Sequence, residues 1–229
     1  MTTPTAGEVR VFGKPVAITR PAQAIALGIG MVHQHFKLID VFTAVENIAL
    51  VMDQHEKYDL KAIREKARAI CDKYAFDIDL DQKVYEMSVS QKQTLEIIKM
   101  LYRGAQILIL DEPTAGLDPA GRDEIFELVR NYHAQSSATI LIVSHSMEDI
   151  SQIADRLLVM DHARVLFCDT PREVFSHADE IVAAGLDIPM ITKVMIELKK
   201  RGHDVDTSVY TVAQAMDALR ACRKKGGAH

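Results

Sequence analysis

Residues 107–123 read ILILDEPTAGLDPAGRD, an apolar run that ends in two adjacent carboxylates, Asp111 and Glu112, followed by a proline and a turn. The run at residues 107–110 is apolar without alternation, which predicts a strand buried on both faces, as in a parallel sheet covered by helices. Such a strand delivers its charged end to the carboxyl edge of the sheet, where ligands bind. Paired carboxylates at that edge are suited to holding Mg²⁺ and orienting a water molecule.

The composition is that of a globular chain. Its 229 residues, 48% hydrophobic and 26% charged, provide enough material for a core in one large or two small domains. The net charge of -5 argues against nucleic acid as the main partner. The apolar runs are too short to span a bilayer, and the N-terminus has no signal-peptide layout. Three cysteines without paired spacing fit a reducing cytosol.

Hydrophobic periodicity predicts alternating strands and helices around this motif. Strands are expected over residues 8–12 and 29–33, helices over 21–27, 60–74 and 147–153, a hairpin around Asp161-His162, and a helix opened by Pro171. Ser90 and Gln93 have the spacing of a capping box at the start of another helix, whose N-terminus would attract a phosphate. Residues 138–146, ATILIVSHS, repeat the buried-strand pattern and end near His145.

The composition changes after Ser176 to short helices joined by glycine and proline, which predicts a small helical appendage over residues 176–229. Thr211 and Gln214 have the spacing to cap its last helix. Apolar side chains repeat at helical spacing in two segments of this appendage: Ile191, Val194, Met195 and Leu198, then Val212, Ala215, Met216 and Leu219. Residues 1–175 are expected to form the main domain.

Five short motifs occur in an order that resembles the ATP-binding-cassette (ABC) ATPases. They are Gln34 in GMVHQHF, Ser88 to Gln91 before a helix, the DE pair after a strand, Gly116-Leu117-Asp118, and His145 after a second strand. In that family they are the Q-loop, signature, Walker B, D-loop and switch histidine. The resemblance implies a P-loop NTPase-like α/β fold with a parallel sheet and a helical subdomain at about residues 43–104.

The resemblance also implies residue roles at the carboxylate edge. Glu112 would be the general base that polarises water, and Asp111 would hold Mg²⁺ through its water shell. Gln34 would sense the γ-phosphate and ligate Mg²⁺. His145 would stabilise the transition state, with helix capping as its structural alternative. His33 and His35 alternate on a strand without an adjacent carboxylate, which favours no metal site there.

The signature segment departs from the family pattern, which is normally LSGGQ. Ser88, Ser90 and Gln91 would contact the γ-phosphate held by a partner cassette, but Val89 and Ser90 replace both glycines. A side chain in place of the second glycine obstructs close approach of backbone to phosphate. Asp118 would act in communication between cassettes, and it can also be a helix N-cap before Pro119.

A phosphate-binding loop of the form G-x-x-x-x-G-K-[ST] is absent from the sequence. The nearest candidate, Gly13-Lys14, is followed by Pro15 and has Glu8 where the first glycine should be. That loop supplies backbone N–H groups and a lysine for the β- and γ-phosphates. The sequence therefore predicts an incomplete cassette, truncated at its N-terminus, whose enzymatic activity is open and whose own binding of ATP and Mg²⁺ is doubtful.

The two halves resemble different branches of the family. The first half is similar to sugar- and nucleoside-uptake ATPases, whereas the second half, from about Ala115-Gly116 onward, is similar to ATPases of energy-coupling-factor (ECF) transporters, which import vitamins and metal ions. A chimera is the preferred explanation, with an unusual natural relative as the alternative.

Two functional classes stay open. In the first, the chain is an ATPase subunit that pairs with a second cassette, as a homodimer or heterodimer, and docks beneath a transmembrane permease on the cytoplasmic face of the membrane. In the second, it is a non-catalytic or engineered cassette fragment that acts only as a folding or pairing module. The missing phosphate loop is the feature that separates them.

Overall fold

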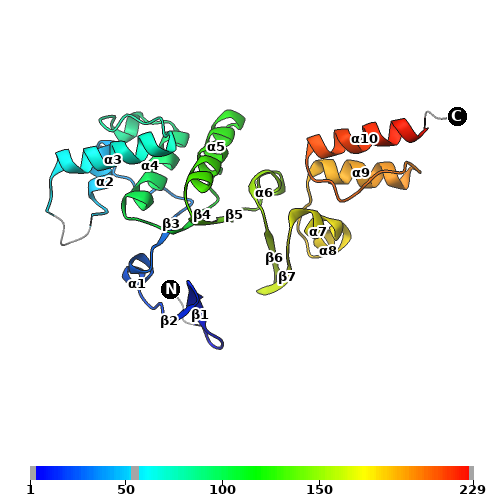
Figure 1. The fold of residues 1–229 in the computed structure, drawn as a ribbon, viewed down its shortest axis with the longest axis horizontal. Helices are drawn as coiled ribbons and strands as arrows, with labels where there is room; N and C mark the ends of the chain where they lie inside the picture. Colours follow the sequence, from blue (N-terminus) through cyan, green and yellow to red (C-terminus); the bar gives the residue numbers. More distant parts are fainter. Residues whose placement is uncertain (1–3, 53–56, 227–229) are drawn as a thin grey trace. The chain divides into compact units, whose positions relative to one another are not determined.

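The carboxylate-ended strand lies in the middle of a three-stranded parallel sheet (Figure 1). In the computed structural model, which describes residues 4–52 and 57–226, β4 (Ile107–Asp111) pairs with β3 (Ile29–Val32) and β5 (Thr139–Val143). The register aligns Val32 with Leu110 and Asp111 with Val143. All three strands therefore end at one edge, and the expected α/β architecture with a parallel sheet is confirmed.

The two strands that were expected to be buried differ in their exposure. In β4, Leu108 and Leu110 are fully buried and the alternate residues are half-buried. In β5, Leu141 and Val143 are 53% and 49% exposed, so the expected burial of residues 138–146 is wrong. β5 is an edge strand among the described residues, and its exposed side chains alternate along the strand and so lie on one face. An apolar run favours a strand, but burial also requires neighbours that cover it.

A helical layer packs around the sheet in the first part of the chain. The helices α2 (Ala44–Ala49), α3 (Leu60–Tyr74) and α4 (Val89–Tyr102) lie side by side (Figure 1). The large aliphatic side chains of these helices that are at most 2% exposed are Ile48, Ile63, Leu95, Ile97 and Ile98. The helix α5 (Pro119–Gln135) contacts α3 and α4 and buries Ile125 and Phe126. The predicted helix over residues 60–74 is confirmed.

The helix α4 begins two residues before its expected start. Ser88 is the N-cap, with an extended backbone (ψ 166°), and it forms a capping box with Gln91. The expected box of Ser90 and Gln93 is therefore wrong, because Ser90 already lies in the first helical turn. Gln93 is 4% exposed within the helix. The segment contains two Ser-x-x-Gln spacings, and the one whose serine has non-helical backbone caps the helix.

The N-terminal segment forms an antiparallel hairpin of β1 (Val9–Val11) and β2 (Lys14–Val16), followed by α1 (Pro21–Ala26). A short 3-10 helix, η1 (Val84–Glu86), precedes α4. A cavity of about 470 Å³ is lined by residues of the hairpin, of α1 and of the turn after α4. The strand at residues 29–33 and the helix at 21–27 are confirmed to within one residue.

The chain divides into two compact units, Met1–Val143 and Ser144–His229. The second unit contains α6 (Met147–Ile153), β6 (Leu157–Asp161), β7 (Arg164–Asp169), α7 (Pro171–Ser176), α8 (Ala178–Ala183), α9 (Met190–Lys200) and α10 (Val212–Gly226). The strands β6 and β7 form the predicted hairpin, whose two turn residues, His162 and Ala163, both have positive φ. This is the geometry of a two-residue primed turn. Pro171 occupies the first turn of α7, as predicted.

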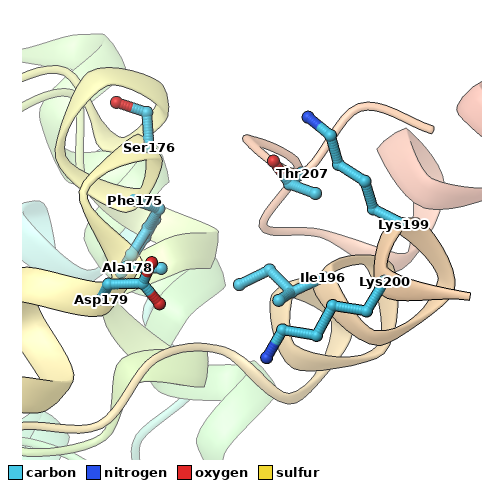
Figure 2. Close-up of a pocket in the computed structure, with 8 residues that line it drawn as sticks. All are labelled: Phe175, Ser176, Ala178, Asp179, Ile196, Lys199, Lys200 and Thr207. Atoms are coloured by element: carbon cyan, nitrogen blue, oxygen red, sulfur yellow. The ribbon is translucent and has the colours of Figure 1, made fainter. Parts of the chain in front are cut away.

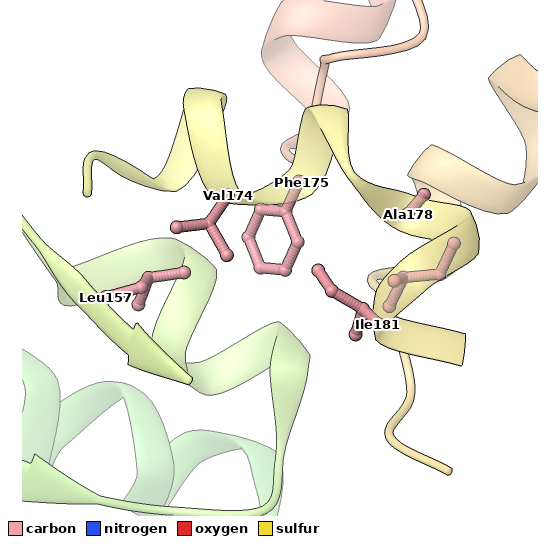
Figure 3. Packing of buried hydrophobic residues seen from close by; sticks show 6 residues of the cluster. Leu157, Val174, Phe175, Ala178 and Ile181 are labelled. Carbon is pink, nitrogen blue, oxygen red and sulfur yellow. The ribbon is translucent and has the colours of Figure 1, made fainter. Parts of the chain in front are cut away.

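One of two buried clusters in the described part of the second unit is centred on Phe175 (Figure 3). Leu157, Val174, Ala178 and Ile181 surround it, and each of these side chains is at most 6% exposed. The cluster contains residues from both sides of position 175, where the boundary of a separate appendage was expected. That domain boundary stays a prediction.

The apolar residues of α10 lie in two environments, one buried and one exposed. Ala215 is buried with Met195 of α9. Val212, Met216 and Leu219 are 68%, 46% and 39% exposed. Thr211 Oγ1 accepts a hydrogen bond from the Gln214 N–H at 3.3 Å, which confirms the predicted cap of this helix.

A second cavity, of about 290 Å³, lies between α7–α8 and α9 within the second unit (Figure 2). Ile196 projects from α9 into it, and Phe175 forms part of the opposite wall. Across residues 4–52 and 57–226, none of the helices combines the length and the apolar character that crossing a bilayer requires.

Candidate functional site

The carboxylate pair lies where β4 ends and the backbone reverses its conformation. Asp111 is the last residue of β4, and Glu112 has φ 48°, a left-handed conformation that is uncommon outside glycine. The Glu112 N–H donates a hydrogen bond to Val143 O at 2.8 Å, which ties the turn to the end of β5. Such a backbone costs about 1–3 kcal/mol and persists where the surrounding structure enforces it, commonly at functional sites.

The turn after Glu112 leads directly into α5. The Ala115 N–H donates to Glu112 O at 3.0 Å, and the Leu117 N–H donates to Thr114 O at 3.2 Å. Asp118 Oδ1 then accepts a hydrogen bond from the Gly121 N–H at 2.8 Å, which makes Asp118 the N-cap of α5. The structural role expected for Asp118 is confirmed. Its role in communication between cassettes stays a prediction.

Gln34 lies at the same sheet edge as the carboxylates. It is exposed and follows β3 by two residues, and the end of β3 is aligned with Leu110, the residue before Asp111. The strand register therefore brings Gln34, Asp111 and Glu112 to one edge of one sheet. In the described part of the chain, no group of three or more histidine, cysteine, aspartate or glutamate side chains is arranged to hold a metal ion. Mg²⁺ binding by Asp111 and Gln34 stays a prediction.

The signature segment uses its polar atoms to cap α4. Ser88 Oγ accepts a hydrogen bond from the Gln91 N–H at 3.2 Å, and Gln91 Oε1 accepts one from the Ser88 N–H at 2.9 Å. The hydroxyl oxygens of Ser88 and Ser90 are 3.0 Å apart. A Cβ built on Gly121 would lie 3.6 Å from the Cβ of Ser90 and 3.0 Å from Asp118 Oδ1. The structure thus brings the start of α4 beside the start of α5.

His145 belongs to the second compact unit, two residues after β5, and it is exposed. The predicted residues therefore form three groups. Gln34, Asp111 and Glu112 share the sheet edge, Ser88, Ser90, Gln91 and Asp118 lie at the starts of α4 and α5, and His145 lies in the second unit.

A buried ion pair near the loop after Gln34 was not singled out in the sequence. Glu96 and Lys99 of α4 are 5% and 4% exposed, and Lys99 Nζ lies 3.3 Å from Glu96 Oε2. Burial lowers the pKa of Lys99 below its ordinary value, although the carboxylate of Glu96 opposes this shift. The sequence shows a charged stripe on this largely apolar helix. It consists of Lys92, Glu96 and Lys99, at intervals of four and three residues.

The fold is shared with solved ATP-binding cassettes. A nucleotide-free ATP-binding cassette from an ABC transporter superimposes with a TM-score of 0.69 at 22% identity, covering 81% of this chain and 79% of that structure. The structure of cbiO1 from Clostridium perfringens, described as part of the ABC transporter complex cbiONQ, gives a TM-score of 0.67 at 27% identity and covers 87% of this chain and 76% of that structure.

The sequence comparisons establish the family. Residues 1–115 match the family described as "ABC transporter". The energy-coupling factor transporter ATP-binding protein EcfA2 of Acetivibrio thermocellus is 35% identical over 221 residues, which cover 94% of this chain and 77% of that protein. The chain therefore belongs to the ABC transporter family.

Other relatives are matched over less of their length. EcfA2 of Clostridioides difficile is 41% identical over 148 residues, 64% of this chain and 51% of that protein. The nucleoside import ATP-binding protein NupA of Lactococcus lactis is 42% identical over 159 residues, 69% of this chain and 31% of that protein. The chain thus spans about half of the first of these relatives and less than a third of the second.

Proposed function

We propose that the chain is the ATP-binding subunit of an ABC-type importer, of the ECF or the nucleoside class, and that the 229-residue polypeptide is inactive by itself. The observation that supports this most directly is the sheet edge, where the strand register aligns the Gln34 end of β3 with Asp111 and Glu112. In this proposal Asp111 and Gln34 hold Mg²⁺, and Glu112 polarises the attacking water. His145 contacts the γ-phosphate, and the signature residues contact the γ-phosphate held by a partner cassette.

The proposed inactivity follows from the missing phosphate loop. Without its backbone N–H groups and lysine, most of the electrostatic binding of the β- and γ-phosphates is lost. Ser88 and Gln91 already exchange hydrogen bonds with each other, which also reduces what they can offer a phosphate. Calorimetric titration of the purified chain with Mg·ATP should show no tight binding. A heat of binding that disappears in Asp111→Asn and Glu112→Gln would contradict the proposal.

A gain-of-function experiment tests the site itself. A segment with a G-x-x-x-x-G-K-[ST] loop, taken from an ECF relative and fused before Gly7, should restore Mg·ATP binding and slow hydrolysis. Glu112→Gln in the fusion should keep binding and lower the hydrolysis rate by about 10²–10⁴-fold, the contribution typical of general-base catalysis. The matched control is Glu124→Gln on α5. Equal rates in the two variants would remove Glu112 from the proposed mechanism.

The second candidate function is a non-catalytic pairing module, and the exposed side of α10 favours it. Val212, Met216 and Leu219 recur at intervals of four and three residues and are all exposed, while Ala215 faces α9. We infer that this surface contacts a second cassette, with a transmembrane permease as the further partner at the inner face of the membrane. Met216→Glu should shift the chain toward monomer in sedimentation, whereas Asp217→Lys should not. A chimeric origin of the chain stays a separate prediction.

A further inference from the structure

The loop between Gln34 and α2 has no regular secondary structure, yet buried side chains hold its backbone. Glu96 Oε1 accepts a hydrogen bond from the Lys37 N–H at 2.7 Å. Lys99 Nζ donates one to Lys37 O at 3.0 Å. The two members of the ion pair therefore satisfy both backbone groups of a single residue 59 to 62 positions away in the chain.

Asn47 of α2 makes the same type of contact two residues further along the loop. Its side chain is fully buried. Its Oδ1 accepts from the Ile39 N–H at 2.8 Å, and its Nδ2 donates to Ile39 O at 3.1 Å and to Thr43 O at 3.0 Å. Lys37 and Ile39 are thus each bound through both backbone groups. Side chains of α4 bind Lys37, and a side chain of α2 binds Ile39.

These contacts explain why α4 carries charges in its interior. A buried ion pair is retained without loss of stability only if its geometry is good and its remaining hydrogen-bonding capacity is met. Here the backbone of Lys37 meets that capacity on both partners. At the N-terminal end of the same stripe, Lys92 Nζ lies 3.9 Å from Asp40 Oδ1. The face of α4 that carries the charged stripe therefore follows the loop along residues 37–40.

We propose that Glu96 and Lys99, together with Asn47, are positioning residues that fix the loop carrying Gln34 onto α4 and α2. Because Ser88 caps the N-terminus of the same α4, the loop and the signature segment are held on one helix. The use of Gln34 toward a nucleotide rests on the proposed function. The contacts of Glu96, Lys99 and Asn47 with the loop do not rest on the proposed function, and they can be tested on the nucleotide-free chain.

The test is residue-resolved amide exchange of the full chain by nuclear magnetic resonance. In the wild type, the amides of Lys37 and Ile39 should exchange at least about 10-fold more slowly than unstructured amides, although they lie in a loop. In the neutral double variant Glu96→Leu/Lys99→Met, which removes both the acceptor and the donor, exchange at Lys37 should accelerate at least about 10-fold and the Gln34 amide resonance should shift. The amide of Leu110 in β4 should keep its wild-type protection.

Two further variants serve as controls. Arg64→Met/Asp81→Asn removes an exposed ion pair of the same unit, and it should leave Lys37 unchanged. Lys99→Arg retains a cation able to donate to both oxygens and should keep the protection. Equal acceleration at Lys37 and Leu110 in the double variant would show that Glu96 and Lys99 stabilise the whole unit and do not specifically hold the loop. That result would overturn the proposal. If the double variant does not fold, fast exchange at Lys37 in the wild type is sufficient to overturn the proposal.

Discussion

The strands β4 and β5 are built from nearly the same residues, ILILD and TILIV, but they occupy different environments. β4 has a paired strand on each side, and Leu108 and Leu110 are at most 1% exposed. β5 is paired on one side among the described residues, and Leu141 and Val143 are about half exposed. The comparison separates two properties that an apolar run is usually taken to predict together, strand formation and burial.

The local sequence determines where a strand forms, whereas the neighbours of the strand determine how much its side chains contribute to the free energy of folding. Each buried aliphatic side chain contributes about 1.5–3 kcal/mol relative to an exposed one. An unpaired edge also leaves backbone N–H and C=O groups available to another strand. β4 should therefore dominate the stability of the first unit, and β5 should dominate its tendency to associate.

Leucine deletions in the two strands should differ most in their cost, although Leu108 and Leu141 lie on opposite faces of the sheet. Leu108→Ala should lower the free energy of unfolding of the first unit by about 2–5 kcal/mol, the range for a buried leucine. Leu141→Ala should cost about 1 kcal/mol or less, because half of that side chain is already in water. Urea unfolding monitored through the amides of α4 reports on this unit alone. Equal losses in the two variants would show that β5 is covered in solution.

The sequence predicted the parts of this unit that depend on local signals. The helix at Leu60–Tyr74 was predicted because apolar residues recur at helical spacing. In the structure, the side chain of Asp59 caps this helix. The strand ending in Asp111 and its parallel sheet were predicted from an unbroken apolar run. The contact of Glu96 with Lys37 was not predicted, because it depends on residues distant in the chain.

The candidate site shows the same limit. The sequence located Gln34, Asp111 and Glu112, and the register explains why they share an edge. The left-handed backbone of Glu112 has no local signal, since nothing about a glutamate indicates positive φ. It follows from the hydrogen bond between the Glu112 N–H and Val143 O, which forms only once β5 pairs with β4. The chemical roles of these residues stay predictions.

A second prediction compares buried and exposed thiols across pH. Burial, with a smaller contribution from Asp72, raises the pKa of the Cys71 thiol from 9.0 to about 11. A raised folded-state pKa stabilises the fold fully below pH 9, and this contribution is lost as the pH rises through about 11. The contribution of Cys71 to the free energy of unfolding should fall by about 1–2 kcal/mol between pH 9 and 10.5, and Cys71→Ala should remove that contribution.

Alkylation provides the matched control for that prediction. Cys168 on β7 is exposed, so iodoacetamide should modify it rapidly in the native chain at pH 8. Cys71 should react only when the first unit unfolds. Native-state alkylation of Cys71 at a rate similar to that of Cys168 would contradict the burial of α3 against its neighbours.

A third, smaller effect distinguishes the two serine positions at the start of α4. Ser88→Ala removes the N-cap and should cost about 1 kcal/mol. Ser90→Ala lies inside the first turn and should cost less, because alanine favours the helix interior and only the contact with the Ser88 hydroxyl is lost. Thermal unfolding of the two variants measures the difference. A larger loss in Ser90→Ala would support the capping register expected from the sequence.

The smallest expected effect on stability concerns the edge of β5, yet it tests the comparison of the two strands most directly. Leu141→Lys and Val143→Lys replace exposed side chains and should change the free energy of unfolding by about 0.5–1 kcal/mol at most. They should nevertheless suppress association, because charges on an edge strand oppose pairing with another chain. Light scattering against concentration should show less association in both variants than in the wild type. Lys61→Glu on α3, a charge change of the same unit away from this edge, is the control. A wild type that stays monomeric, with slow amide exchange over the whole of β5, would mean that another segment already occupies the edge.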